Sequence, residues 1–203
     1  MKPFARRIGK AAFTLIELMV TITIIIILAG LVVGGMEYAN QRSASEKAKT
    51  QIALLSKGIE EYKLDMGGYP PTNNISASLT TSAGSSTSAI IFNALYWDSD
   101  NDGIGVTGPP PAPDTDQKIY LPELDPATSK QGWTTGNASA TTIITDPWGN
   151  QYCYRSAINS SGTTNTATVN PDFDLWSMGK DGKTNTATPS ATDPLNADDI
   201  RNF

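Results

Sequence analysis

Hydrophobic positions follow two different patterns between residues 13 and 66, with no proline or turn cluster between them. The first stretch, FTLIELMVTITIIIILAGLVVGGM at 13–36, is apolar on every side and carries one charge, at Glu17. As a helix this stretch spans about 36 Å, enough to cross a hydrocarbon core of about 30 Å. We therefore predict that residues 13–36 cross a membrane.

The second stretch, residues 37–66, has the pattern of an amphipathic helix. Its apolar or small residues recur in steps of three and four on one stripe: Ala44, Ala48, Ile52, Leu55, Ile59, Tyr62 and Met66. We predict that this stripe covers the sheet of its own domain, and a partner helix in an assembly is the alternative. MGGYPPT at 66–72 should end the helix, because its glycines can cap a C-terminus and its prolines cannot continue it. One helix over 13–66 is predicted.

Residues 67–203 predict a small antiparallel sheet between long polar loops. The strand candidates are TTIIT at 141–145, QYCYRSAI at 151–158 and DFDLWSM at 172–178. DPWGN at 146–150 has the composition of a turn and predicts a hairpin between the first two strands. The simplest way to bury both elements is to lay the sheet on the second half of the helix. The expected fold class is α+β.

The charges around the apolar stretch predict its orientation in the membrane. Residues 1–12 form a basic leader with four cations: Lys2, Arg6, Arg7 and Lys10. Glu37 follows the far end, so the leader should stay in the cytoplasm and residues 67–203 should be exported. A secretory signal peptide is the rival interpretation, but it has a shorter apolar core followed by a small-residue cleavage site. Here Ala11 and Ala12 precede the apolar run.

Composition argues against several functional classes. From Gly67 onward the chain has six Lys or Arg against fourteen Asp or Glu, the wrong sign for a nucleic-acid surface. There is no histidine, which removes His-based catalytic dyads and triads, and we find no other catalytic constellation. Cys153 is the only cysteine, so it has no partner for an internal disulfide, and we expect a small strand residue. We predict that the protein is not an enzyme.

Glu17 needs an explanation, because a charge near the centre of a bilayer helix costs about 2.5 to 3.5 kcal/mol and is normally paired. If the chain were cut between Ala12 and Phe13, the new amino group would be a cation at the membrane surface. Glu17 would then be the fifth residue. Its carboxylate could pair with that amine within one helix, or with the amine of a neighbour in a stack of parallel helices, which would fix their axial register.

KAAFTLIELMVTITIIIILAG resembles the prepilin signature of type IV pilins and type II secretion pseudopilins. In that superfamily a prepilin peptidase cuts before the Phe and methylates its new amino group, and the Glu at mature position five serves filament assembly. The resemblance implies processing between Ala12 and Phe13, with Phe13 and Glu17 as the assembly residues. The family usually has Gly before the cut, where this chain has Ala12.

Four further segments resemble the major pseudopilin of type II secretion: YKLDMGGYPPT, DPWGNQYCYRS, DFDLWSMGKDGK and ADDIRNF. The resemblance implies a type IV pilin-like fold and an inner-membrane subunit with a periplasmic domain. It implies a homopolymeric filament whose partners are minor pseudopilins and the inner-membrane secretion platform. Two alternatives remain: a type IV pilin for adhesion, motility or DNA uptake, and a membrane-anchored periplasmic binding module that never polymerises. For the latter, Trp133, Trp148 and Trp176 would form a sugar platform, although packing roles are favoured.

The resemblance to the major pseudopilin also implies a calcium ion that clamps the C-terminal loop. Carried over by position, Asp181, Asp198 and Asp199 supply carboxylates, and the backbone carbonyl of Met178 is added. The connecting loop at 183–197 is longer than the usual one of the family. Ca²⁺ is the one cofactor expected.

A second acidic cluster, DSDNDG at 98–103, has the pattern that opens an EF-hand-type calcium loop. Asp98, Asp100 and Asp102 stand at alternate positions, and the glycine after them permits a sharp bend. At the twelfth position the pattern expects a bidentate Glu, but Pro109 stands there. Calcium binding and a solvated acidic turn are both open interpretations of this segment.

Overall fold

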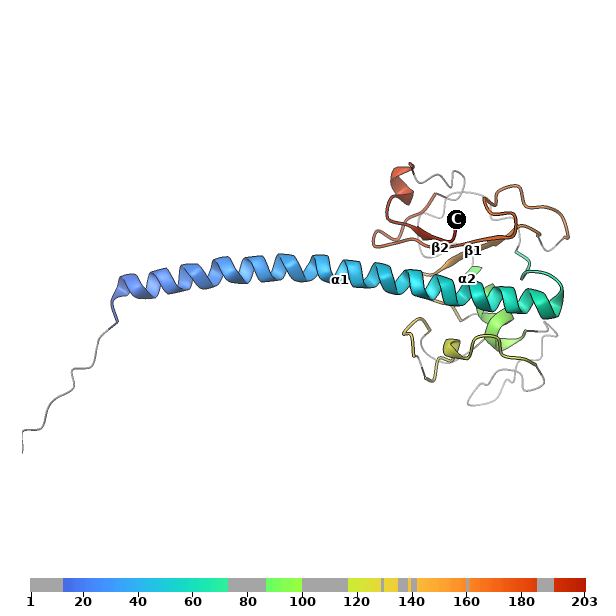
Figure 1. The fold of residues 1–203 in the computed structure, drawn as a ribbon, viewed down its shortest axis with the longest axis horizontal. Helices are drawn as coiled ribbons and strands as arrows, with labels where there is room; N and C mark the ends of the chain where they lie inside the picture. Colours follow the sequence, from blue (N-terminus) through green and yellow to red (C-terminus); the bar gives the residue numbers. More distant parts are fainter. Residues whose placement is uncertain are drawn as a thin grey trace, which may run out of the picture. The chain divides into compact units, whose positions relative to one another are not determined.

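The computed structural model has the α+β architecture expected from the sequence, a long first helix and a small antiparallel sheet (Figure 1). It describes residues 13–72, 87–99, 117–128, 130–134, 139, 142–159, 161–185 and 192–203. The helices are α1 (Leu15–Met66), α2 (Thr87–Phe92), a π-helical turn (Asn93–Trp97) and two 3-10 turns (Pro122–Leu124 and Pro194–Asn196). The strands are β1 (Cys153–Ser156), β2 (Phe173–Ser177) and β3 (Ile200–Arg201). The chain divides into two compact units, residues 1–42 and 43–203.

The predicted end of α1 is confirmed. Its last residue is Met66, and Gly67 follows in the left-handed region with φ 77°. The N–H of Gly67 donates to the carbonyl oxygen of Lys63 at 2.8 Å, which satisfies one of the last carbonyls of the helix. The glycine is needed here because a side chain is disfavoured at this φ.

In the first unit, the described part of α1 exposes its apolar side chains on all sides. The large apolar residues of 13–36 range from 48 % exposed at Ile22 to 81 % at Phe13. Within α1 an 18-residue window reaches a mean hydropathy of 2.7 with no part of it buried. Apolar surface of this extent is unfavourable in water. The helix therefore has the length and the composition of a membrane-crossing segment.

In the second unit, α1 buries the predicted stripe against the core. Ala48, Leu55 and Ile59 are completely buried, as expected from their spacing. Met66 is 44 % exposed, so the prediction was wrong at the last position, where the helix has passed beyond its packing partners. The stripe also includes Gly58, where a Cβ would lie 3.1 Å from Leu95 Cδ1.

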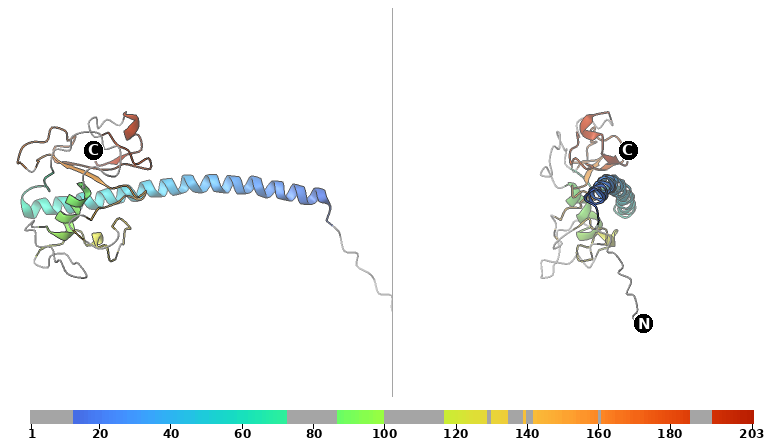
Figure 2. Two further views of the ribbon diagram at one scale, coloured as in Figure 1. Left: turned by 180° about the vertical axis from the view of Figure 1, so that it is seen from behind. Right: turned by 90° about the vertical axis from the view of Figure 1, so that its left-hand side faces the viewer.

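The main core of the second unit is a cluster of buried apolar residues contributed by α1, α2, the residues around Pro122–Leu124 and the first two strands. A second, smaller cluster consists of Cys153, Trp176 and Met178. Figures 1 and 2 show α2 and the segment around Pro122–Leu124, in green and yellow, on one side of α1. The sheet and the C-terminal segment, in orange and red, lie on the other side. The rest of the second unit thus packs on both sides of the second half of α1.

The sheet has the order β1-β2-β3 with both pairs antiparallel. The strand prediction for 151–158 and 172–178 is confirmed in their central parts, β1 and β2. The predicted strand at 141–145 was wrong for the residues described, since only Thr145 forms an isolated bridge, with Gln151. The tight turn at 146–150 is present and connects the two residues of this bridge. Ile144, next to the bridge, is buried in the core cluster. Sequence reasoning missed β3, which has only two residues.

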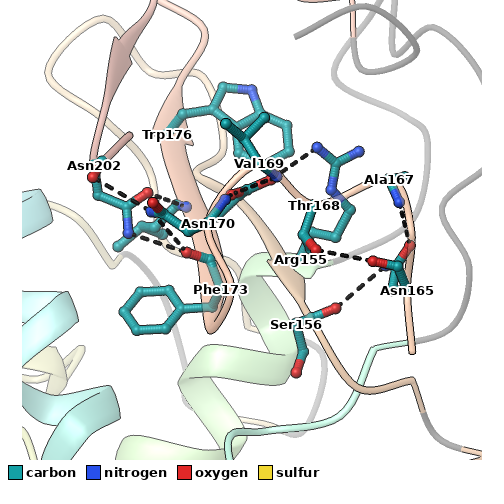
Figure 3. Close-up of polar contacts among 12 residues, drawn as sticks. Arg155, Ser156, Asn165, Ala167, Thr168, Val169, Asn170, Phe173, Trp176 and Asn202 are labelled. Carbon is teal, nitrogen blue, oxygen red and sulfur yellow. Dashed lines mark hydrogen bonds and ion pairs between the residues drawn. The ribbon is translucent and has the colours of Figure 1, made fainter. Parts of the chain in front are cut away.

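A buried ion pair joins β1 to β2 (Figure 3). Arg155 Nη2 lies 2.9 Å from Asp174 Oδ2, and the two side chains are 1 % and 0 % exposed. The carboxylate of Asp174 also accepts the backbone N–H groups of Val169 and Asn170, each at 2.9 Å. A buried charge is tolerated when it is paired and hydrogen-bonded, as this one is. The pair therefore ties the long β1–β2 connection to the sheet.

Candidate functional sites at the helix start and the C-terminal loop

The first turn of α1 contains a reciprocal capping arrangement between Thr14 and Glu17. The backbone N–H of Thr14 donates to Glu17 Oε2 at 3.1 Å, and the Thr14 hydroxyl donates to the same oxygen at 2.9 Å. In return the N–H of Glu17 donates to Thr14 Oγ1 at 3.3 Å. This is a capping box, in which the residue before the helix and the third helical residue satisfy each other's free donors.

The cap explains how an isolated subunit tolerates Glu17 in an apolar helix. The N-terminal turn of a helix has unpaired N–H groups and a partial positive charge, so it favours a carboxylate. Both bonds that Glu17 accepts end on Oε2, and within the described residues Oε1 has no hydrogen-bond partner. Sequence reasoning missed Thr14, although the T-x-x-E spacing before an apolar run signals a capping box. Ala12 lies outside the described residues.

The C-terminal loop brings two of the predicted calcium ligands together. The N–H of Asp181 donates to Asp198 Oδ2 at 3.0 Å, so the loop after β2 meets the segment before β3. Asp181 Oδ1 accepts the N–H of Lys183 at 2.8 Å, which closes the loop on itself. Met178 is buried at the start of this loop.

Asp199 is held differently from its neighbour Asp198. Its Oδ2 accepts from the Thr184 hydroxyl at 2.8 Å and forms an ion pair with Arg201 at 3.3 Å. Its Oδ1 is buried and, among the residues that the structure describes, has no hydrogen-bond partner. Burial, as the main cause, raises the pKa of Asp199 to about 6, and the negative charges of Asp198 and Asp181 add to the rise.

These residues fit a cation in one respect and fall short in another. The Asp199 carboxyl has an orphaned buried oxygen, and its pKa is raised first by burial and then by two nearby carboxylates. A hard cation here would relieve both the unmet acceptor and the repulsion. Within the described residues, however, no three acidic groups are gathered closely enough to hold a metal ion as they stand. Arg201 competes for Asp199.

The second acidic cluster can be followed only at its first residue, since Asp100 and Asp102 lie outside the described residues. The N–H of Asp98 donates to the carbonyl oxygen of Asn93 at 2.9 Å, which ends the π-helical turn. Asp98 also lines a hollow of about 320 Å³ together with Tyr62, Asn93 and other residues. The EF-hand interpretation of 98–103 stays a prediction.

Trp133, Trp176 and Cys153 have packing roles, whereas Trp148 is half-buried in the turn at 146–150. Trp133 is completely buried, and its indole N–H donates to the carbonyl oxygen of Glu123 at 2.8 Å. Trp176 is 2 % exposed and packs edge-on against Phe203. Neither side chain offers a face to a sugar. Cys153 is buried, as expected for a small strand residue, and burial raises the pKa of its thiol and keeps it protonated.

The start of the chain defines the class of protein. Residues 7–33 match the prokaryotic N-terminal methylation motif. This motif, the long exposed apolar helix and the small antiparallel sheet together define a pilin-like subunit with a membrane-anchoring N-terminal helix.

The rest of the chain defines the particular family. Type II secretion system (T2SS), protein G matches residues 36–101 and 111–193, and the chain belongs to this family. It is 29 % identical over 181 residues to type II secretion system core protein G of Escherichia coli (strain K12), covering 87 % of this chain and 86 % of that protein. The protein of the same name from Pseudomonas aeruginosa is 28 % identical over 178 residues, covering 88 % and 89 %. That from Aeromonas hydrophila is 40 % identical over 63 residues, 31 % of this chain and 44 % of the relative.

The chain is therefore a major pseudopilin, a structural subunit of a type II secretion system, as its sequence segments indicated. Its family is known for a structural role in secretion and is not known as a family of enzymes. A type IV pilin and a non-polymerising binding module are not favoured by these matches.

Proposed function

We propose that this pseudopilin is cut between Ala12 and Phe13 by a prepilin peptidase, methylated on the new amino group, and polymerised through residues 13–36. The polymer is a periplasmic pseudopilus that drives folded proteins across the outer membrane. One observation carries the proposal: Glu17 lies in the first turn of α1, at the start of its exposed apolar stretch, and its Oε1 has no hydrogen-bond partner among the described residues.

The two oxygens of the Glu17 carboxylate can therefore have different partners. Oε2 stays on the Thr14 cap of its own helix, and Oε1 accepts from the Phe13 amine of a neighbouring subunit. Such a bond is charge-assisted and lies in a medium of low dielectric constant, which makes it strong and sensitive to position. Parallel helices one step out of register would leave both charges unpaired in lipid, so the pair selects one axial register.

The charge pattern supports a single-pass orientation in the inner membrane. The basic leader at 1–12 faces the cytoplasm, and residues 67–203 lie in the periplasm. In this arrangement the exported domain contacts other copies and minor pseudopilins. The start of the helix is accessible to the peptidase and to the inner-membrane secretion platform.

We further propose that the C-terminal loop binds Ca²⁺ through Asp181, Asp198 and Asp199, with the Met178 carbonyl as an additional ligand. The orphaned Oδ1 of Asp199 and the meeting of Asp181 with Asp198 support this site. The ion would neutralise the carboxylates and pin the segment before β3 to the loop after β2. Differential scanning calorimetry of the full chain in detergent, with Ca²⁺ and with chelator, tests the site. A higher unfolding midpoint with Ca²⁺ is expected, and equal midpoints would refute the site.

The assembly proposal is tested by Glu17→Ala, with Glu37→Ala as the matched control. Glu37 is the next carboxylate along α1 and lies just beyond the apolar stretch. Both variants are expected to insert in the membrane and to be processed, and only Glu17→Ala should fail to form filaments and to support secretion. Normal filaments from Glu17→Ala would overturn the proposal.

A separate measurement distinguishes this function from that of a type IV pilin. Deletion of the chain is expected to abolish protein secretion and to leave adhesion, motility and DNA uptake unchanged. Long surface fibres that persist in a secretion-competent strain would instead favour the pilin function.

A further inference from the structure

The turn at 146–150 is closed from the inside by a buried aspartate. Asp146 is 3 % exposed, and its Oδ1 accepts the backbone N–H groups of Trp148 at 3.0 Å and Asn150 at 2.8 Å. The N–H of Asp146 donates to the carbonyl oxygen of Asn150 at 2.7 Å. Because these three bonds fix the backbone of the turn, they also fix where the Asn150 side chain begins.

From this turn, two side chains reach the loop that carries Asp181. Asn150 Nδ2 donates to the carbonyl oxygen of Gly179 at 2.7 Å. Asp146 Oδ2 accepts the Ser177 hydroxyl at 2.5 Å, and Ser177 Oγ in turn accepts the N–H of Gly179 at 3.1 Å. Both backbone polar groups of Gly179 are thus held by the turn, one directly and one through Ser177.

The fit of this loop against its neighbours is close at two glycines. A Cβ at Gly182, which has φ +64°, would lie 2.8 Å from Asn150 Oδ1. A Cβ at Gly179 would lie 2.4 Å from the backbone oxygen of Asp198. The loop is therefore in close contact with both the turn at 146–150 and the segment that contains Asp198.

We propose that Asn150 and Asp146 are positioning residues for the calcium site: they hold the loop so that Asp181 and Asp198 stay adjacent before an ion arrives. This inference rests on the calcium site put forward under the proposed function. Neither residue needs to touch the ion. A loop that is already ordered loses less conformational freedom on binding, so the same ligands bind calcium more tightly.

The test is Asn150→Ala in the full chain, purified in detergent and titrated with CaCl₂ by isothermal calorimetry. Loss of a group that orients metal ligands typically weakens metal affinity about 10- to 100-fold, and we expect a Kd change in this range. The matched control is Asn165→Ala. Asn165 is also a loop amide, more buried than Asn150, and its side chain bonds to Ser156 and Ala167 (Figure 3) and not to Gly179. Its Kd should equal that of the wild type.

A second readout needs no calcium. Limited trypsin digestion in chelator should cut after Lys180 and Lys183 faster in Asn150→Ala than in the wild type, and no faster in Asn165→Ala. If Asn150→Ala does not fold, Ser177→Ala carries the same test, because it removes the link to the Gly179 N–H and leaves the turn intact.

The outcomes separate the two proposals. A wild-type chain that does not bind calcium refutes the calcium site and this inference together. A wild type that binds, with Asn150→Ala binding within twofold of it, leaves the site standing and overturns only the positioning role. The same holds if Asn165→Ala weakens calcium binding as much as Asn150→Ala, since the effect would then be one of general stability.

Discussion

Thr14 and Glu17 each donate a backbone N–H to the side chain of the other, at 3.1 and 3.3 Å, and so close the first turn of α1. Glu17, the residue proposed to act in assembly, is therefore part of the cap of its own helix. A carboxylate that is already held in place by its own chain has less freedom to lose when a neighbouring subunit supplies the amine.

Replacement of Thr14 by valine should loosen this turn without changing its shape. Loss of an N-cap hydroxyl costs about 1 kcal/mol. We expect faster amide hydrogen exchange in the first turn of α1, measured by mass spectrometry in micelles. The control is Thr21→Val, because the Thr21 hydroxyl donates to the carbonyl oxygen of Leu18 within the helix and caps nothing. Equal exchange in the first turn of both variants would contradict the capping role.

The buried pair between Arg155 and Asp174 should be the costliest charge to remove. Asp174→Asn removes the carboxylate from this buried guanidinium, and loss of one partner of a buried pair costs about 3 to 5 kcal/mol of unfolding free energy. Glu61→Gln disrupts an exposed pair with Lys57, at 3.8 Å, and should cost less than about 1 kcal/mol. Denaturant titration of both variants in detergent measures the difference. Equal losses of unfolding free energy would show that the Arg155–Asp174 pair is accessible to water in the folded protein.

Gly179→Ala and Gly162→Ala form a matched pair of substitutions. Both glycines have positive φ, 62° and 75°, so both variants incur the left-handed penalty of about 1 to 2 kcal/mol. A Cβ at Gly162 meets nothing within 4 Å, whereas at Gly179 it meets the backbone of Asp198. Gly179→Ala should therefore lower the unfolding midpoint further than Gly162→Ala. Equal midpoints would mean that Asp198 is free to move away.

The pH dependence of stability should reveal the buried carboxyl of Asp199. Its pKa is raised from 3.8 to about 6, so the folded protein keeps a proton that the unfolded chain has released. The resulting stability is fully present below pH 3.8 and is lost as the pH rises through 6. In chelator the wild type should lose more stability between pH 4 and pH 7 than Asp199→Asn does. Parallel curves would show that Asp199 titrates as an exposed carboxyl.

The sequence predicted the parts of the fold that depend on local pattern. Periodicity located the buried side of α1 through Ala48 and Ile59, and glycine and proline located its end. The signal of β3 is not local, since this strand has two residues and exists only because the chain returns to β2. The strand prediction at 141–145 was wrong because a pair of isoleucines is compatible with a strand and with a loop that, as here, buries only Ile144 and exposes Ile143.

The sites divide in the same way. Phe13 and Glu17 stand out because a charge in an apolar run is conspicuous, and Thr14 could have been found from its spacing. The contact between Asn150 and Gly179 joins residues 29 apart in the chain, and no sequence pattern near either residue predicts this contact. Only the folded arrangement of the turn, the loop and the segment before β3 reveals it.

Glu17 can find its countercharge on a neighbouring subunit only if the chain is cut before Phe13. Intact-mass and N-terminal peptide mass spectrometry of the membrane-extracted protein measures this. We expect a chain that begins at Phe13 and carries one methyl group on its amino terminus. A chain that still begins at Met1 when it is isolated from secreting cells would rule out the proposed pairing of Glu17 with the Phe13 amine.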